Sequence, residues 1–267
     1  MTLLRWIEAK DSFKGQQGFP FDIPVIQTLK RLEFTRAVTI LVGENGTGKS
    51  TVMESIAALA NLPTVGRDDA SHDDSLEHAH RLAKHLKLVW NKRTHRGFFL
   101  RAEDFFNFCH RIRSIKTEAQ ASLEHIDDTY GNRSNLASIL ARAPHLRSIG
   151  ELEAAYGPDL DARSHGESFM KLFETRLVPD GLYLLDEPEA PLSPTRQLAL
   201  LSLIKSMTNE GCQFIIATHS PIIMAIPDAQ LLSLDSCPPS EVEFNDLEHV
   251  KLLRNFLNGP ERFLRHL

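Results

Sequence analysis

Cysteine is scarce in this sequence, and its few cysteines form no recognisable pattern. The 267 residues contain three, Cys109, Cys212 and Cys237, which are far apart and lack Cys-x-x-Cys spacing. Such usage excludes a disulfide framework and a cysteine-based zinc site, and it is typical of proteins in a reducing compartment. We therefore expect these thiols to be buried or without a chemical role.

Long apolar runs are also absent. The first ten residues include Arg5 and Glu8, which excludes the apolar core of about 7 to 15 residues that a secretory signal needs. The most apolar later run, 214–226, is interrupted by His219 and Pro221 and is shorter than the roughly 18 residues of a membrane span. The sequence thus predicts a cytoplasmic protein that does not insert into a membrane.

An overall positive charge is lacking as well. The formal net charge is -5, and the isoelectric point is about 6.2. This balance excludes a chain that coats nucleic acid or anionic lipid with its whole surface, although a local basic face stays open. With 42% hydrophobic residues, the chain is predicted to form a single domain, 1–267, around one substantial core.

A glycine-rich loop lies between a predicted strand at 38–42 and a predicted helix at 50–59. The loop sequence Gly-Glu-Asn-Gly-Thr-Gly-Lys-Ser satisfies the P-loop pattern G-x-x-x-x-G-K-[ST] in the structural context that this pattern needs. Its glycines let backbone N–H groups surround phosphates, its lysine reaches the β- and γ-phosphates, and its serine hydroxyl binds Mg²⁺. The predicted nucleotide-binding residues are Gly43, Glu44, Asn45, Gly46, Thr47, Gly48, Lys49, Ser50 and Thr51.

Two carboxylates end a second predicted strand, 182–185. Asp186 is placed to hold Mg²⁺ together with Ser50, because the carboxyl end of a parallel strand faces the ligand. Glu187 is placed to act as a general base or to orient the water that attacks the γ-phosphate. Glu187 and Lys49 are therefore candidate catalytic residues. The alternative is an acidic strand end that only faces solvent.

These motifs resemble the ABC-type P-loop ATPase superfamily, and within it the branch that includes SMC, RecF and related AAA-type ATP-binding proteins without a transmembrane domain. The segment 164–168, Ser-His-Gly-Glu-Ser, precedes Asp186 and is similar to the family signature Leu-Ser-Gly-Gly-Gln. The resemblance implies that Ser164 and Gly166 contact the ATP held by a second copy. An ordinary serine N-cap is the alternative. The sequence departs from the signature at Arg163, His165 and Glu167.

The resemblance extends to two residues that follow Glu187 in the sequence, His219 and Ser193. His219 follows the predicted strand 213–217 and is similar to the family's switch histidine, whose ring reports the presence of the γ-phosphate. It is therefore the third candidate catalytic residue. Ser193 lies in a segment similar to the D-loop at the subunit seam, and a simple turn is the equal alternative for it.

Two features of the family are not found in their usual form. The glutamine that follows the P-loop is missing from 97–106, where Glu103 is the candidate to take its place near Mg²⁺. The aromatic residue that stacks on adenine is open between Phe19 and Phe21, and either of them fits a place in the core equally well.

The resemblance also implies a fold. We expect an α/β P-loop NTPase fold with a mainly parallel sheet, an antiparallel β portion over 3–34, and an inserted, mostly helical lobe over 66–165 that ends in the signature. Within 81–147, thirteen Lys or Arg residues stand against six Asp or Glu. They form either a face that contacts phosphates or dispersed, solvated charges. They include Lys84, Lys87, Lys92, Arg93, Arg96, Arg101, Arg111 and Arg113.

The implied activity is ATP hydrolysis with Mg²⁺ in a head-to-tail homodimer that has two shared ATP sites. The first candidate for its work is DNA repair, chromosome maintenance or defence, with DNA or another nucleic acid as a partner. The cytoplasmic ATPase subunit of an ABC transporter is the alternative, and an ATP-gated regulatory binding module is a second one. The sequence does not identify the molecule on which the ATPase acts or any protein partner, because a P-loop core indicates only that ATP is bound.

Overall fold

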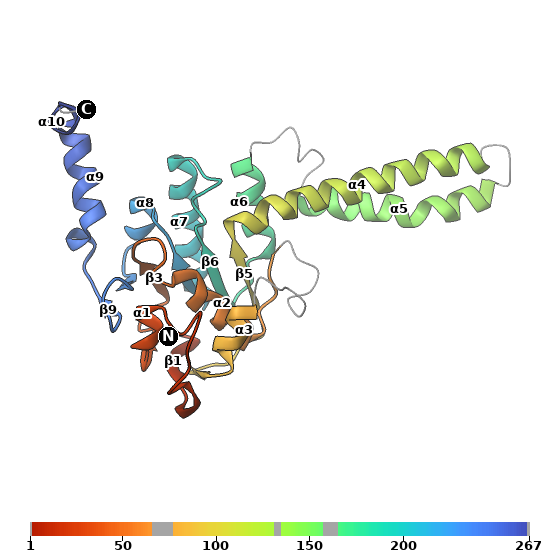
Figure 1. The fold of residues 1–267 in the computed structure, drawn as a ribbon. Coiled ribbons are helices and arrows are strands. Elements are labelled where there is room, and N and C mark those ends of the chain that lie inside the picture. The colour runs from red at the N-terminus through yellow and green to blue at the C-terminus, as the bar shows by residue number, and fades with distance from the viewer. Residues whose placement is uncertain (1, 66–76, 131–134, 157–164, 266–267) are drawn as a thin grey trace.

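The computed structural model describes residues 2–65, 77–130, 135–156 and 165–265 of the chain. These residues build two β-sheets, the helices that cover them, and a long helical hairpin that extends away from the body (Figure 1). Within these ranges, no helix is both long and apolar enough to cross a membrane.

The larger sheet has six strands in the order β5-β6-β7-β3-β8-β9. Neighbours from β5 to β8 run parallel, and β9 pairs antiparallel with β8. All residues of β3, β6 and β7 are buried, which explains their apolar runs, since a parallel sheet is covered on both faces. The carboxyl ends of these three strands therefore lie at one edge. The strands are β3 (Val38–Val42), β5 (Gly97–Arg101), β6 (Leu182–Asp186), β7 (Gln213–Ala217), β8 (Gln230–Ser233) and β9 (Ser240–Glu241).

The smaller sheet is antiparallel and has β1 (Leu4–Ala9) between β2 (Arg31–Glu33) and β4 (Leu86–Trp90). Gln213, at the start of β7, joins the two sheets, because its side chain accepts hydrogen bonds from the N–H groups of Leu3 and Leu4 at 2.8 and 2.7 Å. The predicted α/β fold, with a mainly parallel sheet and an N-terminal antiparallel β portion, is confirmed.

The predicted helical lobe over 66–165 differs from the structure in its first part. Residues 86–90 and 97–101 are strands of the two sheets, and Leu86 and Phe99 are fully buried there. The predicted lobe was mostly helical, and these two strands are its non-helical part, because their apolar side chains complete the core of the sheets. The helical part starts at α4 (Ala102–Tyr130) and continues with α5 (Asn135–Tyr156). Residues 66–76 and 157–164, at the two ends of the predicted lobe, lie outside the described residues.

Helices α4 and α5 form the hairpin (Figure 1). Lys116 of α4 and Glu153 of α5 join them by an ion pair of 2.9 Å. At its base, the ring of Phe105 on α4 packs edge to face against the ring of Phe169 on α6 (His165–Arg176), with 4.7 Å between the ring centroids. The base of the hairpin is therefore part of the core, whereas its length extends beyond the body.

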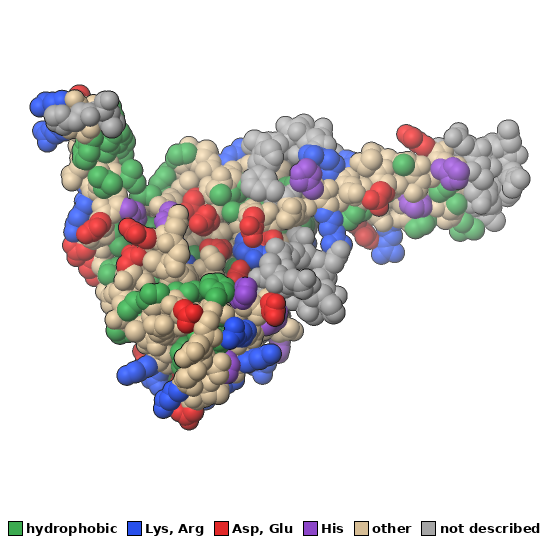
Figure 2. All heavy atoms as spheres, viewed as in Figure 1, with side chains coloured by type: hydrophobic (Ala, Val, Ile, Leu, Met, Phe, Trp, Pro, Cys, Tyr) green, Lys and Arg blue, Asp and Glu red, His purple; other side chains and the backbone are tan. Residues whose placement is uncertain are grey.

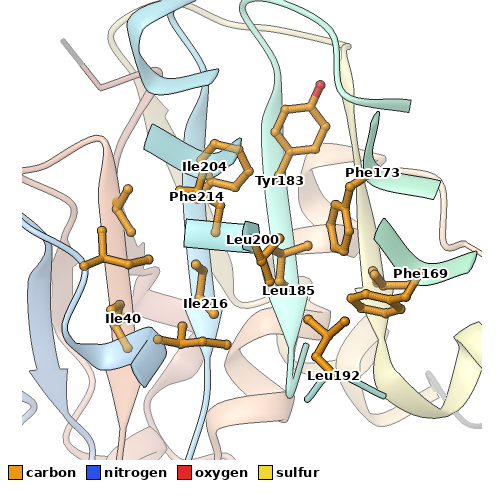
Figure 3. Close-up of a cluster of buried hydrophobic side chains, with 14 of the residues drawn as sticks. Ile40, Phe169, Phe173, Tyr183, Leu185, Leu192, Leu200, Ile204, Phe214 and Ile216 are labelled. Carbon is orange, nitrogen blue, oxygen red and sulfur yellow. The ribbon is translucent and has the colours of Figure 1, made fainter. Parts of the chain in front are cut away.

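The core lies on both faces of the larger sheet. On one face, α6 and α7 (Pro194–Asn209) pack their apolar sides against Tyr183, Phe214 and Ile216 (Figure 3). On the other face, α2 (Lys49–Ala60) lies between this sheet and the smaller one. The remaining helices are η1 (Asp11–Phe13), α1 (Pro24–Gln27), α3 (Glu77–Ala83), α8 (Pro221–Met224), η4 (Phe244–Asp246), α9 (Glu248–Asn258) and α10 (Pro260–Leu264).

Candidate active site

The predicted P-loop connects β3 to α2 and depends on glycine at two positions. Gly46 and Gly48 have φ angles of 84° and 98°, in the left-handed region that strains residues with a Cβ atom. A Cβ on Gly48 would also lie 3.1 Å from Cγ2 of Ile23. Gly48 is the N-cap of α2 and offers no side chain to its first turn. The backbone N–H groups of this turn are therefore available to an anion.

Lys49 is buried inside the loop, with 6% of its surface exposed. Its Nζ donates hydrogen bonds to the carbonyl oxygens of Gly43 and Glu44 at 2.8 and 2.9 Å. Burial lowers the pKa of Lys49, and the nearby carboxylates of Asp186 and Asp235 oppose this shift. The structure thus holds a cation at the centre of the loop, where a phosphate would meet it.

Asp186 is the last residue of β6 and lines one pocket together with Ser50. Burial raises the pKa of Asp186 to about 6, while the neighbouring Ser50 hydroxyl opposes this shift. The Oδ1 atom of Asp186 is buried without a hydrogen-bond partner among the described residues. A buried carboxylate oxygen in this state costs free energy. Mg²⁺ prefers oxygen ligands, so Asp186 and Ser50 fit the metal that the sequence predicts here.

Glu187 follows Asp186 at the carboxyl edge of the sheet and is exposed. Its φ of 50° is unusual for a residue with a side chain, and its N–H donates to the carbonyl oxygen of Ala217 at 2.8 Å. Its side chain lines a pocket of about 280 Å³ with Lys49 and a second pocket of about 240 Å³ with Asp186. Ser50 lines both pockets, so these four residues meet at one place.

His219 follows β7 and reaches the P-loop from the opposite side. It lines a cavity of about 680 Å³ together with Gly43, Glu44 and Thr47. Its backbone N–H donates to Oε1 of Glu189 at 2.7 Å. The parallel register of β6 and β7 therefore brings His219 to the edge where Asp186 and Glu187 lie.

Comparison with known proteins finds similarity to ATP-binding proteins. A family profile described as "AAA domain, putative AbiEii toxin, Type IV TA system" matches residues 134–225. A "Putative ABC transporter ATP-binding protein" of Methanosarcina acetivorans is 28% identical over 194 residues, which make up 67% of this chain and 62% of that protein. The "Chelated iron transport system membrane protein YfeB" of Yersinia pestis is 28% identical over 194 residues, or 68% of this chain and 56% of that protein.

The fold is α/β, with a mainly parallel six-stranded sheet and an N-terminal antiparallel sheet. The chain spans less than two thirds of the length of the two curated relatives above, at 62% and 56%. Among solved structures, the Smc head domain of Pyrococcus furiosus matches with a TM-score of 0.45 and 14% identity, over 96% of this chain and 100% of that chain. The residue roles predicted for an ABC-type site are tested neither by these matches nor by the geometry, and they stay predictions.

Glu189 is a residue of this candidate site that sequence reasoning missed. Its Oε1 accepts hydrogen bonds from the Thr218 hydroxyl and the His219 N–H, both at 2.7 Å, and from the Ser220 N–H at 3.1 Å. It thus fixes the loop that carries His219. Asp235 was missed too, and its Oδ1 accepts the N–H of Glu44 at 2.8 Å. No motif marks either residue, because both contacts depend on how distant strand ends meet.

A buried ion cluster beside Asp186 was also missed. Arg101 pairs with Asp186 across the β5–β6 ladder, and only 7% of its side chain is exposed. Its Nε donates to Asp104 at 2.7 Å, and its NH1 donates to Glu54 of α2 at 2.9 Å. Burial raises the pKa of Glu54, and the Arg101 guanidinium opposes this. The cluster connects the P-loop helix, the strand of Asp186 and the start of α4.

The structure places the candidates for two family features, the residue that replaces the glutamine after the P-loop and the aromatic residue that stacks on adenine. Glu103 lines the pocket of about 240 Å³ with Ser50, Asp186 and Glu187, which fits its predicted place near Mg²⁺. Phe21 is 2% exposed and belongs to the core, whereas Phe19 is 51% exposed and lines the P-loop pocket. Of the two aromatic candidates, Phe19 alone is accessible to a base.

The described part of the predicted signature begins helix α6. Ser164 lies outside the described residues. Gly166 is buried in the first turn of α6, where a Cβ would lie 2.7 Å from Cδ of Arg196. Arg196 also forms an ion pair of 2.7 Å with Glu167, which ties α6 to α7. Among the described residues that line the pockets around the P-loop, none belongs to α6.

The basic residues of 81–147 lie on different elements. Arg101 is buried in its ion cluster, Lys87 pairs with Glu8 of β1 at 3.2 Å, and Lys92 pairs with Asp180 at 2.8 Å. These three belong to β5, to β4 and to the segment between them, and not to the hairpin. The basic excess was predicted to form either a phosphate-contacting face or dispersed charges. Arg101, Lys87 and Lys92 fit the second interpretation, because they are dispersed.

Proposed function

We propose that the chain binds ATP with Mg²⁺ and hydrolyses its β–γ phosphoanhydride. The observation that carries this proposal is the buried, unpartnered Oδ1 of Asp186 beside the Ser50 hydroxyl, next to a P-loop that encloses the Lys49 amine. A strand end that merely faced solvent would not bury a carboxylate. The arrangement is what a metal-bound triphosphate requires.

The chain's own residues supply the chemistry of the step. When bound, Mg²⁺ neutralises charge that develops on the phosphate oxygens, and Asp186 and Ser50 hold it. Lys49 exchanges its two backbone acceptors for phosphate oxygens. Glu187, exposed at the same edge, orients the attacking water and accepts its proton. His219, which Glu189 fixes through the backbone, meets the γ-phosphate from the other side.

We further propose that two copies complete each site. In the ABC family, the signature of one subunit closes over the ATP held by the other. No described residue of α6 lines the P-loop pockets of its own chain here, which leaves this side open. Ser164 and Gly166 of a second copy would close this side and add backbone and hydroxyl donors to the phosphate. The functional unit is thus a homodimer with two shared ATP sites, and ATP brings the copies together.

Among the processes that ATP hydrolysis could drive, transport with a membrane partner is supported best. The two curated relatives described above are named as parts of transport systems. The chain would then be the ATPase subunit that binds a membrane partner, without inserting itself. The ion pairs of Lys87 and Lys92 with carboxylates also make these two lysines poor candidates for a nucleic-acid face.

Nucleic-acid work in repair, chromosome maintenance or defence is the second candidate. The long α4–α5 hairpin supports it, because it extends away from the body and offers a surface for such a partner (Figure 1). The matched family description also names a toxin–antitoxin system. ATPase rates measured alone, with DNA or RNA, and with membranes separate the two. Stimulation by nucleic acid at low salt supports the second, and copurification with a membrane protein supports the first.

A further inference from the structure

The described chain ends in a helical arm with an apolar side. Helices α9 and α10 project from the body (Figure 1), and Val250 is the buried residue of α9. By contrast, Leu252, Leu253 and Leu257 are 57%, 41% and 73% exposed. At 100° per residue, these leucines fall on one side of α9, which is the pattern of a helix that packs against a partner. The opposite side carries Glu248, Lys251, Asn255 and Asn258.

An apolar groove of about 660 Å³ lies between this arm and the body. Leu253 and Leu257 form its wall on the arm, and Ile222 of α8 and Phe244 of η4 form its floor on the body. His219 and the residues next to it line the groove as well. The groove is therefore continuous with the edge of the sheet that the proposed dimer covers. A contiguous apolar surface of this kind marks a binding site.

Charge along the arm identifies the occupant. The base of the arm carries more acidic than basic side chains, and its tip carries more basic than acidic ones (Figure 2). Two arms packed antiparallel around a two-fold axis place each basic tip beside the acidic base of the other, with opposed helix dipoles. An anionic membrane would attract the tip but repel the base. At the base, the acidic residues Glu241, Glu243, Asp246 and Glu248 stand against Lys251, which pairs with Asp246, and Arg254, which donates to Asn245. At the tip, Arg262 and Arg265 stand against Glu261.

We propose that α9 packs antiparallel against α9 of a second copy, so that each arm fills the groove of the other. The contact is isologous, because the same leucine side supplies both surfaces. It goes beyond the proposed function, since an apolar helix pair needs no nucleotide. The arms would keep two copies together when ATP is absent from the shared sites.

Sedimentation of the full chain without nucleotide, over a wide range of concentration, tests this contact. The parent chain should form dimers. Leu257→Glu should lower the association constant by about a hundredfold or more, because a two-fold dimer loses two buried leucines. Asn255→Glu is the matched control, with the same charge on the polar side of the same helix, and it should leave association unchanged. Both positions are exposed, so circular dichroism should show an intact fold.

Charge reversal distinguishes a second copy from other partners. Arg262→Glu with Arg265→Glu should weaken the dimer, and adding Glu243→Lys and Glu248→Lys should restore it, because opposite charges again face each other. A monomeric parent chain, or equal association of the Leu257→Glu and Asn255→Glu variants, overturns the proposal. So does a monomeric parent that binds phosphatidylglycerol vesicles through the arm.

The same experiment keeps this proposal separate from the shared ATP sites. Leu257→Glu chains that also carry Glu187→Gln should still dimerise when ATP is added, because the P-loop and signature are intact. If they do so while the parent is monomeric without ATP, the arm contact fails and the shared-site proposal stands. If the arm dimer forms but ATP does not bind, the proposed function fails and the arm contact stands.

Discussion

Replacing Arg101 by methionine should strongly destabilise the chain. The guanidinium bonds Asp104, whose side chain is 0% exposed, at 2.7 and 3.4 Å, and it bonds Glu54, which is 16% exposed, at 2.9 Å. Methionine fills a similar volume but leaves two carboxylates without their cation. Breaking a buried ion pair costs about 3–5 kcal/mol. For a chain of this size, each kcal/mol lowers Tm by about 2–4 °C, so a fall of roughly 6–20 °C is expected.

Thermal unfolding followed by circular dichroism, without nucleotide and at neutral pH, measures this loss. Lys92→Met is the matched control, because Lys92 pairs with Asp180 at the similar distance of 2.8 Å but both side chains are largely exposed. Such an exposed pair contributes little to stability, because water screens both charges. Adding Asp104→Asn and Glu54→Gln to Arg101→Met should recover much of the loss, since no unpaired charge remains buried. An Arg101→Met chain as stable as the Lys92→Met chain refutes the reasoning.

Four further outcomes are expected at the proposed ATP site. Lys49→Ala should abolish tight ATP binding, and equal affinity by calorimetry would contradict the P-loop assignment. Glu187→Gln should keep ATP binding but lower turnover by roughly 10² or more, the range of general base catalysis; unchanged turnover would exclude it as the catalytic carboxylate. Ser164→Arg chains mixed with Lys49→Ala chains should regain activity, whereas a flat mixing curve argues against shared sites. Asp186→Asn should raise stability without Mg²⁺ at neutral pH by up to about 3 kcal/mol.

The sign of the last effect follows from the raised pKa of Asp186, from 3.8 to about 6. The folded chain binds this proton more tightly than the unfolded chain, so the free energy of unfolding falls as pH rises from about 4 to 6. Above that window the carboxylate is ionised and disfavoured by burial. The advantage of Asp186→Asn in urea unfolding should therefore disappear below about pH 4. An advantage that is independent of pH would point to packing instead of charge.

The sequence was sufficient for those parts of the site that lie at strand ends. A run of buried residues followed by Gly43, Asp186 or His219 identifies the carboxyl end of a parallel strand, and such ends meet at one edge of the sheet. The meeting of Arg101 with Glu54 was not predictable, because it depends on the register between β5 and β6 and on the position of α2.

The limits of the helical lobe could not be predicted for a related reason. Residues 86–90 and 97–101 are runs of five residues, too short to distinguish a buried strand from part of a helix by periodicity. The partner strands that decide between the two, β1 and β6, lie far away in the sequence. The arm at 248–264 carries no family motif, and only its exposure in the folded chain shows that it is unpaired.

The α4–α5 hairpin would amplify small movements at the proposed ATP site. Helix α4 has 29 residues, so at 1.5 Å per residue it is about 43 Å long. It starts directly after Arg101, which is joined to the P-loop helix through Glu54. A rotation of about 10° at this base moves the far end of a rod of that length by roughly 7 Å. A distance measured between the far end of the hairpin and the body would therefore report rotations at the base that are too small to detect at the site itself.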